Sequence, residues 1–137
     1  MIESQYTQAI HKLIPKEVYR WKINDSFQGG VADAYYSGTN GDLWIEYKYL
    51  KALPKRSSTQ ITPALRPNQQ KWLRDRHAEG RNVMVILGSP SGSILLPYPE
   101  WETGVTRDAF EARSLSKQEI ANWITEQCTT DSRNERT

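Results

Sequence analysis

The sequence predicts a single mixed α/β domain, in which helices flank a central sheet and an extra helix follows at the C-terminus. Three consecutive strand patterns between residues 18 and 50 favour antiparallel neighbours. A helical segment then separates them from a buried apolar run at 82–88, which favours a parallel crossover. The order is therefore helix, three strands, helix and strand (αβββαβ), followed by a weaker strand at 93–96. We expect residues 1–128 to form this domain and the polar residues 129–137 to form a frayed tail.

The first half of the chain supplies the first four elements. The opening helix carries one apolar stripe and ends before Pro15. The stripe consists of Ile2, Tyr6, Ala9, Ile10 and Leu13. Residues 18–23 alternate apolar and basic side chains, and residues 31–37 form the second strand. A hairpin turn at 38–42 leads into the third strand at 43–50, which has the strongest pattern in the chain.

The second half begins with a long connection at 51–66 that is basic and rich in Pro, Ser and Thr. Loops of this length are uncommon in compact domains and usually have a function. Pro67 suits the first position of a helix, and Gly80 suits the position after its end. Ser116 and Glu119 form a capping box that opens the final helix.

Cysteine content and hydropathy exclude several classes of protein. The single cysteine, Cys128, excludes an intramolecular disulfide, and with only two histidines it also excludes a Cys-rich zinc module. The first residues lack a basic region followed by an apolar run, as a signal peptide would have. No apolar stretch approaches the ~20 residues that a membrane helix needs. We therefore expect a soluble, cytoplasmic protein with no membrane partner.

The formal net charge of +2 conceals an uneven distribution of charge. Residues 46–76 carry eight Lys or Arg and two Asp or Glu, a net charge of +6. Residues 1–45 carry −1 and residues 77–137 carry −3. A basic segment of this kind fits a polyanion such as nucleic acid, although it also fits a solvated helix face. The aromatic residues, five Trp and seven Tyr against two Phe, suit both half-exposed packing and the stacking of bases.

The third predicted strand places charged residues on one of its faces. Side chains alternate along a strand, so Trp44, Glu46, Lys48 and Leu50 share a face, and Leu43, Ile45, Tyr47 and Tyr49 share the other. Glu46 and Lys48 stand about 7 Å apart along the strand and can converge on one point. A charged pair on a partly apolar face costs free energy unless it is paired or holds a ligand. An ordinary cross-strand ion pair is the alternative.

Asp33, in the preceding strand, adds a second carboxylate. Counting back from the hairpin turn places Asp33 near Glu46 across the strand pair. Two carboxylates and the amine of Lys48 suit a hard divalent cation such as Mg²⁺, which lowers the pKa of a bound water and offsets the charge of a phosphate. Gly29 and Gly30, just before this strand, would let a nucleic-acid backbone come close.

These residues resemble a known motif. Gly30-Val31-Ala32-Asp33, followed after twelve residues by Glu46-Tyr47-Lys48, resembles the motif of the PD-(D/E)XK nuclease superfamily, with Ala32 in place of the motif proline. The order αβββαβ is that of its restriction-endonuclease-like core. Leu65 to Trp72 resembles the helix opening of the VRR-NUC and Holliday-junction-resolvase-like branches, and the compact size is similar to that of small phage-type members. The resemblance covers about residues 1–88.

The resemblance implies a role for each matched residue. Asp33 and Glu46 would hold Mg²⁺ or Mn²⁺ together with the backbone carbonyl of Tyr47, and Lys48 would be the catalytic lysine. Gln69 would face the site from the following helix, with Gln70 as the competing choice.

Glu3 resembles the helical acid that many members direct at the metal. Alternatively, it is an ordinary acid at a helix N-terminus, where the helix dipole favours negative charge.

Basic residues around these positions are candidates for contacts with DNA phosphates, although each could equally serve solubility. They are Lys51, Lys55, Arg56, Lys71, Arg74, Arg20 and Lys22.

The sequence thus predicts a metal-dependent deoxyribonuclease that hydrolyses phosphodiester bonds in DNA. The resemblance favours a structure-selective enzyme that acts on branched DNA or junctions, or a nicking enzyme, and it allows a homodimer. If the gene belongs to a phage, the enzyme would work in the host cytoplasm. Two alternatives stay open. One is restriction-like or exonuclease activity at the same site, and the other is a non-catalytic DNA-binding or inhibitory module with the same fold.

Overall fold

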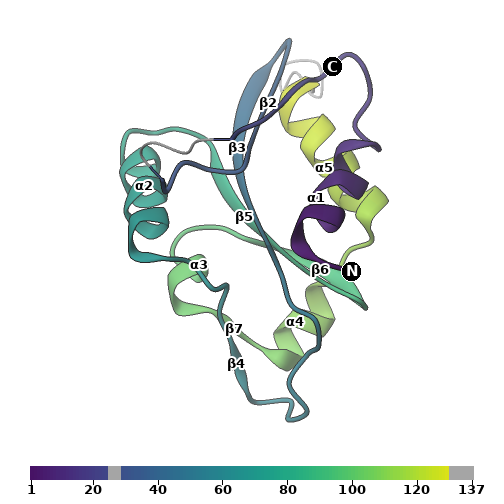
Figure 1. Ribbon diagram of the computed structural model, residues 1–137, viewed down its shortest axis with the longest axis vertical. Helices are drawn as coiled ribbons and strands as arrows, with labels where there is room; N and C mark the ends of the chain where they lie inside the picture. The colour runs from purple at the N-terminus through teal and green to yellow at the C-terminus, as the bar shows by residue number, and fades with distance from the viewer. Residues whose placement is uncertain (25–28, 130–137) are drawn as a thin grey trace, which may run out of the picture.

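The computed structural model describes residues 1–24 and 29–129, and it contains a mixed five-stranded sheet (Figure 1). The strands are β1 (Tyr19–Lys22), β2 (Ala34–Gly38), β3 (Gly41–Tyr49), β5 (Val83–Ser89) and β6 (Gly92–Leu96), and they lie side by side in the order β1-β2-β3-β5-β6. Only the pairing of β3 with β5 is parallel, and the other three pairings are antiparallel. The predicted fold class, an αβββαβ core with a mixed sheet and an extra C-terminal helix, is confirmed.

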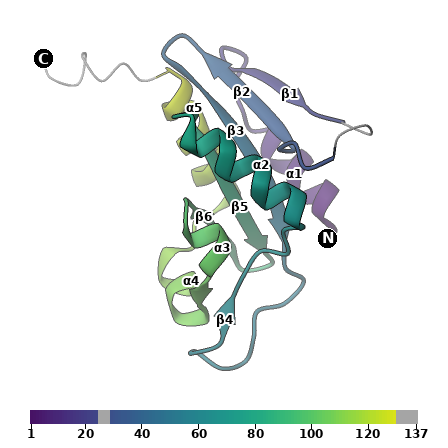
Figure 2. The same cartoon turned by 90° about the vertical axis from the view of Figure 1, so that its left-hand side faces the viewer.

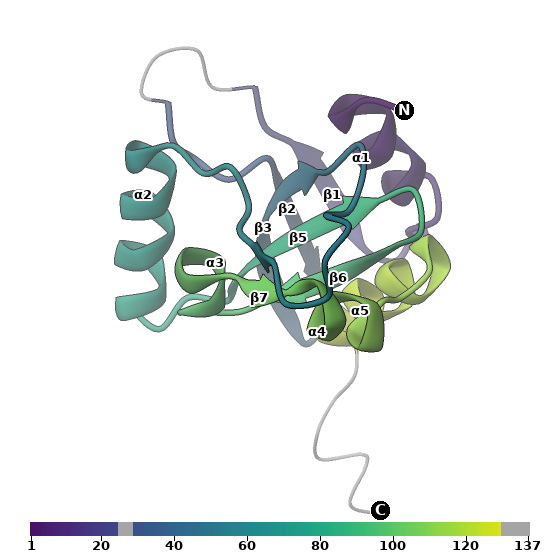
Figure 3. The ribbon, with the colours of Figure 1, turned by 90° about the horizontal axis from the view of Figure 1, so that it is seen from below.

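Helices cover both faces of this sheet. Helices α1 (Glu3–His11) and α5 (Lys117–Thr129) pack against β3 on one face, which we call the α1/α5 face. Helix α2 (Pro67–Ala78) packs against β5 on the opposite face, which we call the α2 face (Figures 2 and 3). The predicted capping box opens α5, because the Glu119 N–H donates to the Ser116 hydroxyl at 3.0 Å and the Ser116 N–H donates to the Glu119 carboxylate at 2.9 Å.

Each face has its own apolar core, and alternation along the strands separates the two. On β5, Ile86 enters the core of the α1/α5 face, whereas Val85 and Leu87 enter the core of the α2 face. On β3, Ile45 enters the first core and Trp44 packs against the second, as the alternating pattern predicts.

The hairpin between β2 and β3 fixes the register that the site requires. Gly38 pairs with Gly41 around a two-residue turn, and Ala34 pairs with Ile45 at the other end of β2. Asp33 therefore stands next to the last pair, directly beside Glu46 of the neighbouring strand.

The sequence did not predict a group of short elements at one end of the sheet. The connection 51–66 contains β4 (Gln60–Ile61), which pairs with β7 (Val105–Thr106). Helices α3 (Glu100–Thr103) and α4 (Arg107–Arg113) flank β7, and Figure 1 shows this group below the main sheet. Elements of two to seven residues are too short to give a periodic pattern.

The last helix continues one residue into the predicted C-terminal tail. Helix α5 extends to Thr129, the first residue of the predicted tail, whose hydroxyl donates to the Thr125 carbonyl at 2.7 Å. The rest of that tail, residues 130–137, lies outside the described residues.

Among the residues that are described, no helix is long and apolar enough to cross a membrane.

Candidate active site

The motif residues meet near the middle of β3, where the beginnings of α1, α2 and β2 come together. Glu46 and Lys48 share the α2 face of β3, as predicted, and Lys48 Nζ lies 3.5 Å from Glu46 Oε2. The Glu46 side chain is 1% exposed and that of Lys48 is 15% exposed. A buried carboxylate held beside a nearly buried ammonium group is a costly arrangement, so it points to a function rather than to stability alone.

Asp33 joins this pair from β2. Its Oδ2 accepts the Tyr47 N–H at 2.9 Å. In an extended strand the N–H and C=O of one residue point the same way, so the Tyr47 carbonyl also faces the Asp33 side of β3. Burial raises the pKa of the Asp33 carboxyl, and the Tyr47 N–H and Lys48 partly oppose this rise.

Gln69 reaches Glu46 from the first turn of α2. Its Nε2 donates to Glu46 Oε2 at 3.1 Å, and its Oε1 accepts the Arg66 N–H at 2.9 Å. The second bond fixes the side chain, because both ends of the amide are then held. The structure therefore brings Gln69 to the site, and Gln70 is the next position round the helix. Sequence reasoning missed the contribution of Arg66, although its place before Pro67 marks it as the residue that caps the helix.

Glu46 carries the strongest electrostatic perturbation in the site. Burial, followed by the neighbouring Asp33 carboxylate, raises its pKa to about 8, although Lys48 opposes this. Its Oε2 contacts both Lys48 and Gln69, whereas its Oε1 is buried and has no hydrogen-bond partner among residues 1–24 and 29–129. A buried acceptor without a partner is rare in folded proteins, and this one stands beside a second carboxylate.

Glu3, at the first position of α1, lies at the rim of this site. It lines a small hollow of about 120 Å³ together with Ser4, Thr7, Lys22 and Asp33. Burial raises the pKa of the Glu3 carboxyl, Lys48 opposes the rise and Asp33 adds to it. The structure thus places Glu3 within electrostatic reach of the catalytic candidates, in addition to its position at a helix N-terminus.

The donor set fits a hard divalent cation. Asp33 and Glu46 supply carboxylate oxygens, one of them without a partner, and Tyr47 supplies a carbonyl on the same side. In the part of the chain that the structure describes, no three His, Cys, Asp or Glu side chains gather closely enough to hold a metal by themselves. An ion here would therefore keep water ligands, which is the usual behaviour of Mg²⁺.

The two glycines before β2 allow a close contact within the chain. Gly29 and Gly30 have φ of 66° and 80°, a conformation that side chains rarely adopt. A Cβ on Gly30 would lie 2.7 Å from the Asn68 carbonyl oxygen. These glycines therefore let the segment before β2 pack against the start of α2. The expectation that they also make room for a nucleic-acid backbone stays a prediction.

The basic candidates fall into three groups. Lys51, Lys55 and Arg56 are exposed in the connection between β3 and β4. Two residues of α2 pair with acidic groups, Lys71 with Asp75 at 2.6 Å and Arg74 with Glu102 at 3.2 Å.

The two basic residues of β1 point to the α1/α5 face. Lys22 reaches the hollow beside Asp33 and Glu3. Arg20 instead donates to the carbonyls of His11 at 2.9 Å and Ile14 at 2.8 Å. It therefore satisfies acceptors at the end of α1, and the structure does not bring it to the site.

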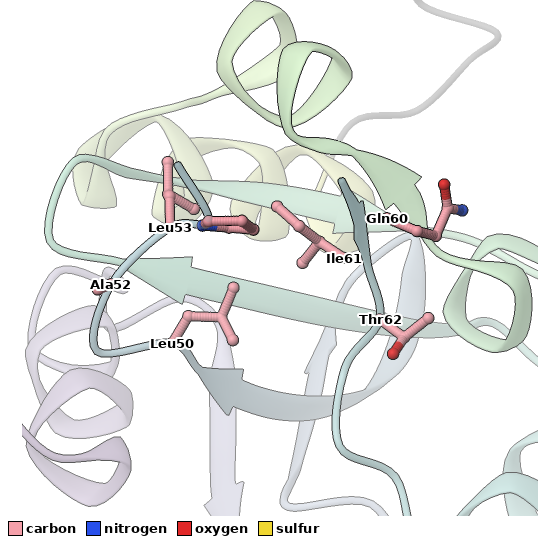
Figure 4. A pocket seen from close by; sticks show the side chains of 7 residues that line it. Leu50, Ala52, Leu53, Gln60, Ile61 and Thr62 are labelled. Atoms are coloured by element: carbon pink, nitrogen blue, oxygen red, sulfur yellow. The ribbon is translucent and has the colours of Figure 1, made fainter. Parts of the chain in front are cut away.

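A hollow of mixed polarity lies beyond the C-terminal end of β3 (Figure 4). Its volume is about 390 Å³. It is lined by Leu50, Ala52, Leu53, Pro54, Gln60, Ile61 and Thr62. Leu50 follows Lys48 by two residues along the direction of β3, so this hollow begins near the site.

Comparison with known proteins agrees with this fold. No family model matches the chain, and a search of the curated proteins finds no significant match. Among solved structures, the fold is similar to that of a nuclease of the restriction-endonuclease-like class. That protein is Hjc, a Holliday junction resolvase from the archaeal hyperthermophile Archaeoglobus fulgidus, with a TM-score of 0.51 and 15% sequence identity. The similarity covers 89% of this chain and 97% of Hjc.

Proposed function

We propose that this chain is a metal-dependent deoxyribonuclease that hydrolyses phosphodiester bonds at a site formed by Asp33, Glu46 and Lys48. One observation carries the proposal. Glu46 is buried beside Lys48 and Asp33 with one carboxylate oxygen left without a partner. Such a group is prepared for a ligand that the chain itself does not provide.

Each residue has a defined task in this proposal. Asp33, Glu46 and the Tyr47 carbonyl would hold Mg²⁺ or Mn²⁺, which activates a bound water and offsets the phosphate charge. Lys48 orients the attacking water and stabilises the negative charge that develops on the phosphate oxygens. Gln69 holds the Glu46 carboxylate in place through its bond to Oε2. The water attacks phosphorus directly, so no covalent enzyme intermediate forms.

We further propose a structure-selective enzyme, acting on branched DNA or junctions or nicking one strand. The support is the similarity of fold to Hjc, whose name describes a Holliday junction resolvase. Cutting two strands symmetrically requires two sites, so a homodimer belongs to this proposal. Three finer assignments are further hypotheses of this proposal: membership of the VRR-NUC branch, a phage-type enzyme and a cytoplasmic location.

The test is cleavage of supercoiled plasmid with Mg²⁺ or Mn²⁺ by the wild type, Asp33→Ala and Lys48→Ala. We expect nicked or linear product from the wild type only. Lys16→Ala, which removes an exposed lysine between α1 and β1, is the matched control and should cleave normally. Equal cleavage by all four proteins would indicate a contaminating nuclease and would refute the site.

A panel of substrates separates the remaining activities. Holliday junctions, forks, nicked duplex and single strands distinguish a junction enzyme from a restriction-like enzyme or an exonuclease. Binding of DNA without any product in either metal would instead indicate the non-catalytic module.

A further inference from the structure

A row of aromatic side chains crosses the α2 face of the sheet beside the candidate site. We call it the aromatic strip, and it consists of Trp21 on β1, Tyr35 on β2, Trp44 on β3 and Trp72 on α2. Trp21 stands opposite Tyr35, and Tyr35 stands opposite Trp44, in the register of the three strands. The ring centroids of Tyr35 and Trp44 are 4.5 Å apart, and those of Trp44 and Trp72 are 5.4 Å apart.

The aromatic strip is open to solvent, unlike an apolar core. Trp21 is 48% exposed on the edge strand of the sheet, and the other three members are half-buried. Every residue of β1 is exposed, so among the described residues no element covers this end of the strip. Large aromatic surface left in water is a feature of binding sites for apolar or aromatic ligands.

The position of the strip relates it to the site. Trp44 precedes Glu46 by two residues on β3, and Tyr35 follows Asp33 by two residues on β2. Residues two apart in a strand share a face and lie about 7 Å apart. The strip therefore continues from Glu46 along the same face of β3, and on the neighbouring strand it begins two residues after Asp33.

The charge around the strip suits a nucleic acid. Residues 46–76, which begin two residues after Trp44 and include Trp72, carry a net charge of +6. The Arg76 guanidinium lies 5.4 Å from the centre of the Trp72 ring and is also paired with the Glu79 carboxylate at 2.8 Å. Aromatic rings interleaved with cations form the type of surface that stacks the bases of single-stranded nucleic acid while its phosphates meet positive charge.

We propose that the aromatic strip stacks unpaired bases of the DNA strand that enters the active site. This inference rests on the proposed function and narrows its substrate class. In a duplex each base face is covered by its neighbours in the stack, so a flat aromatic surface can meet only bases that are unpaired or terminal. The strip therefore selects DNA with unpaired nucleotides next to the scissile phosphate, as at a branch point or a flap.

The test is the affinity of the full chain for labelled DNA without metal, so that no cleavage occurs. The probes are a short oligodeoxythymidine and a blunt duplex of the same length. Fluorescence anisotropy measures the binding of each probe. Stacking contributes about 1–3 kcal/mol per base, so Trp21→Ala should weaken binding of the single strand about 5- to 150-fold. The same change should alter duplex binding less than about twofold.

Two further variants make the result specific. Trp21→Phe keeps an aromatic face and should retain most of the single-strand affinity. Tyr98→Ala removes a comparably exposed ring (40%) that lies against His77, outside the strip, and should bind both probes as the wild type does. The proposal is overturned if Trp21→Ala binds the single strand like the wild type, or if it loses affinity for both probes equally. Absence of cleavage by the wild type of the plasmid and of every substrate in the panel would refute the nuclease, whereas the binding comparison alone tests the role of the strip.

Discussion

The two faces of the sheet use aromatic and polar side chains in opposite ways. On the α1/α5 face, Tyr6, Tyr36 and Tyr47 are fully buried and their hydroxyls are all bonded. The Tyr36 hydroxyl lies 2.6 Å from that of Tyr47 and 3.1 Å from His11 Nδ1, and Tyr6 donates to the Ser93 hydroxyl. These tyrosine hydroxyls satisfy one another and so stabilise the core and make it specific, although His11 Nε2 beside them is also buried without a partner among the described residues.

On the α2 face, the corresponding groups are left incomplete. Glu46 keeps one buried oxygen without a partner, and Trp21 leaves half of its side chain in solvent. Both features are unfavourable for an isolated domain, and both would become favourable on binding of the proposed cation and nucleic acid. The comparison teaches that one face maintains the fold while the other is shaped for ligands, and adjacent residues of one strand should therefore respond differently to substitution.

The largest expected effect is the loss of cleavage in Glu46→Gln. The amide keeps the shape of the side chain but removes the charge that would hold the metal, so cleavage should fall on the order of 10³-fold. The measurement is the initial rate of plasmid nicking in Mg²⁺, with the fold checked by circular dichroism. Glu17→Gln, at an exposed carboxylate before β1, serves as the control and should keep the wild-type rate. Substantial nicking by folded Glu46→Gln would mean that the α2 face is not the catalytic one.

The next effect concerns Ile45, the neighbour of Glu46 on the opposite face. Ile45 is fully buried in the core of the α1/α5 face. Ile45→Ala should reduce the free energy of unfolding by about 2–5 kcal/mol, because it removes buried methyl groups and leaves a cavity. Urea unfolding measures this change. A loss below about 1 kcal/mol would contradict the assignment of this face to stability.

The contrast between the faces of β3 could be predicted from the sequence, because side chains alternate in any strand. The approach of Asp33 to Glu46 could also be predicted, since a short hairpin fixes the register between its strands. The choice between Gln69 and Gln70 could not. The two residues point in directions about 100° apart on the helix, and only the packing of α2 against the sheet decides which one meets Glu46.

The aromatic strip lay beyond sequence reasoning for a related reason. Trp21, Tyr35 and Trp44 become neighbours through the pairing of three strands, and the long connection between β1 and β2 does not fix that pairing. Trp72 joins them only through the docking of α2. The role of Gly30 was missed because its contact, the Asn68 carbonyl, is distant in sequence.

A third prediction is that the two faces respond to pH in opposite directions in the metal-free protein. Burial and Asp33 raise the pKa of Glu46 from 4.5 to about 8, so the fold favours the neutral acid and loses stability as pH rises through this interval. Burial, with Arg20 and Lys22, lowers the pKa of His11 from 6.5 to about 4. The fold therefore favours the neutral imidazole and loses stability as pH falls from 6.5 towards 4.

Urea unfolding across this pH range measures both losses of stability. We call the loss at rising pH the alkaline limb of the stability curve and the loss at falling pH its acid limb. Glu46→Gln should flatten the alkaline limb and leave the acid limb in place, whereas His11→Gln should flatten the acid limb alone. If either variant gives a stability curve parallel to that of the wild type, the group it removes does not control that limb.

The smallest expected effect separates two adjacent tyrosines of β2. The Tyr36 hydroxyl is buried between Tyr47 and His11, so Tyr36→Phe leaves those polar groups without their partner and should cost about 1–3 kcal/mol of unfolding free energy. The Tyr35 hydroxyl bonds Asp42 at 2.5 Å on the surface, where water can replace it, so Tyr35→Phe should change stability by less than about 0.5 kcal/mol. The phenyl ring of Tyr35→Phe should also keep the stacking surface of the aromatic strip, and the variant should therefore bind single-stranded DNA as the wild type does. Equal losses of stability in the two variants would contradict the proposed difference between the faces, in which the polar groups of the α1/α5 face stabilise the fold and those of the α2 face await a ligand.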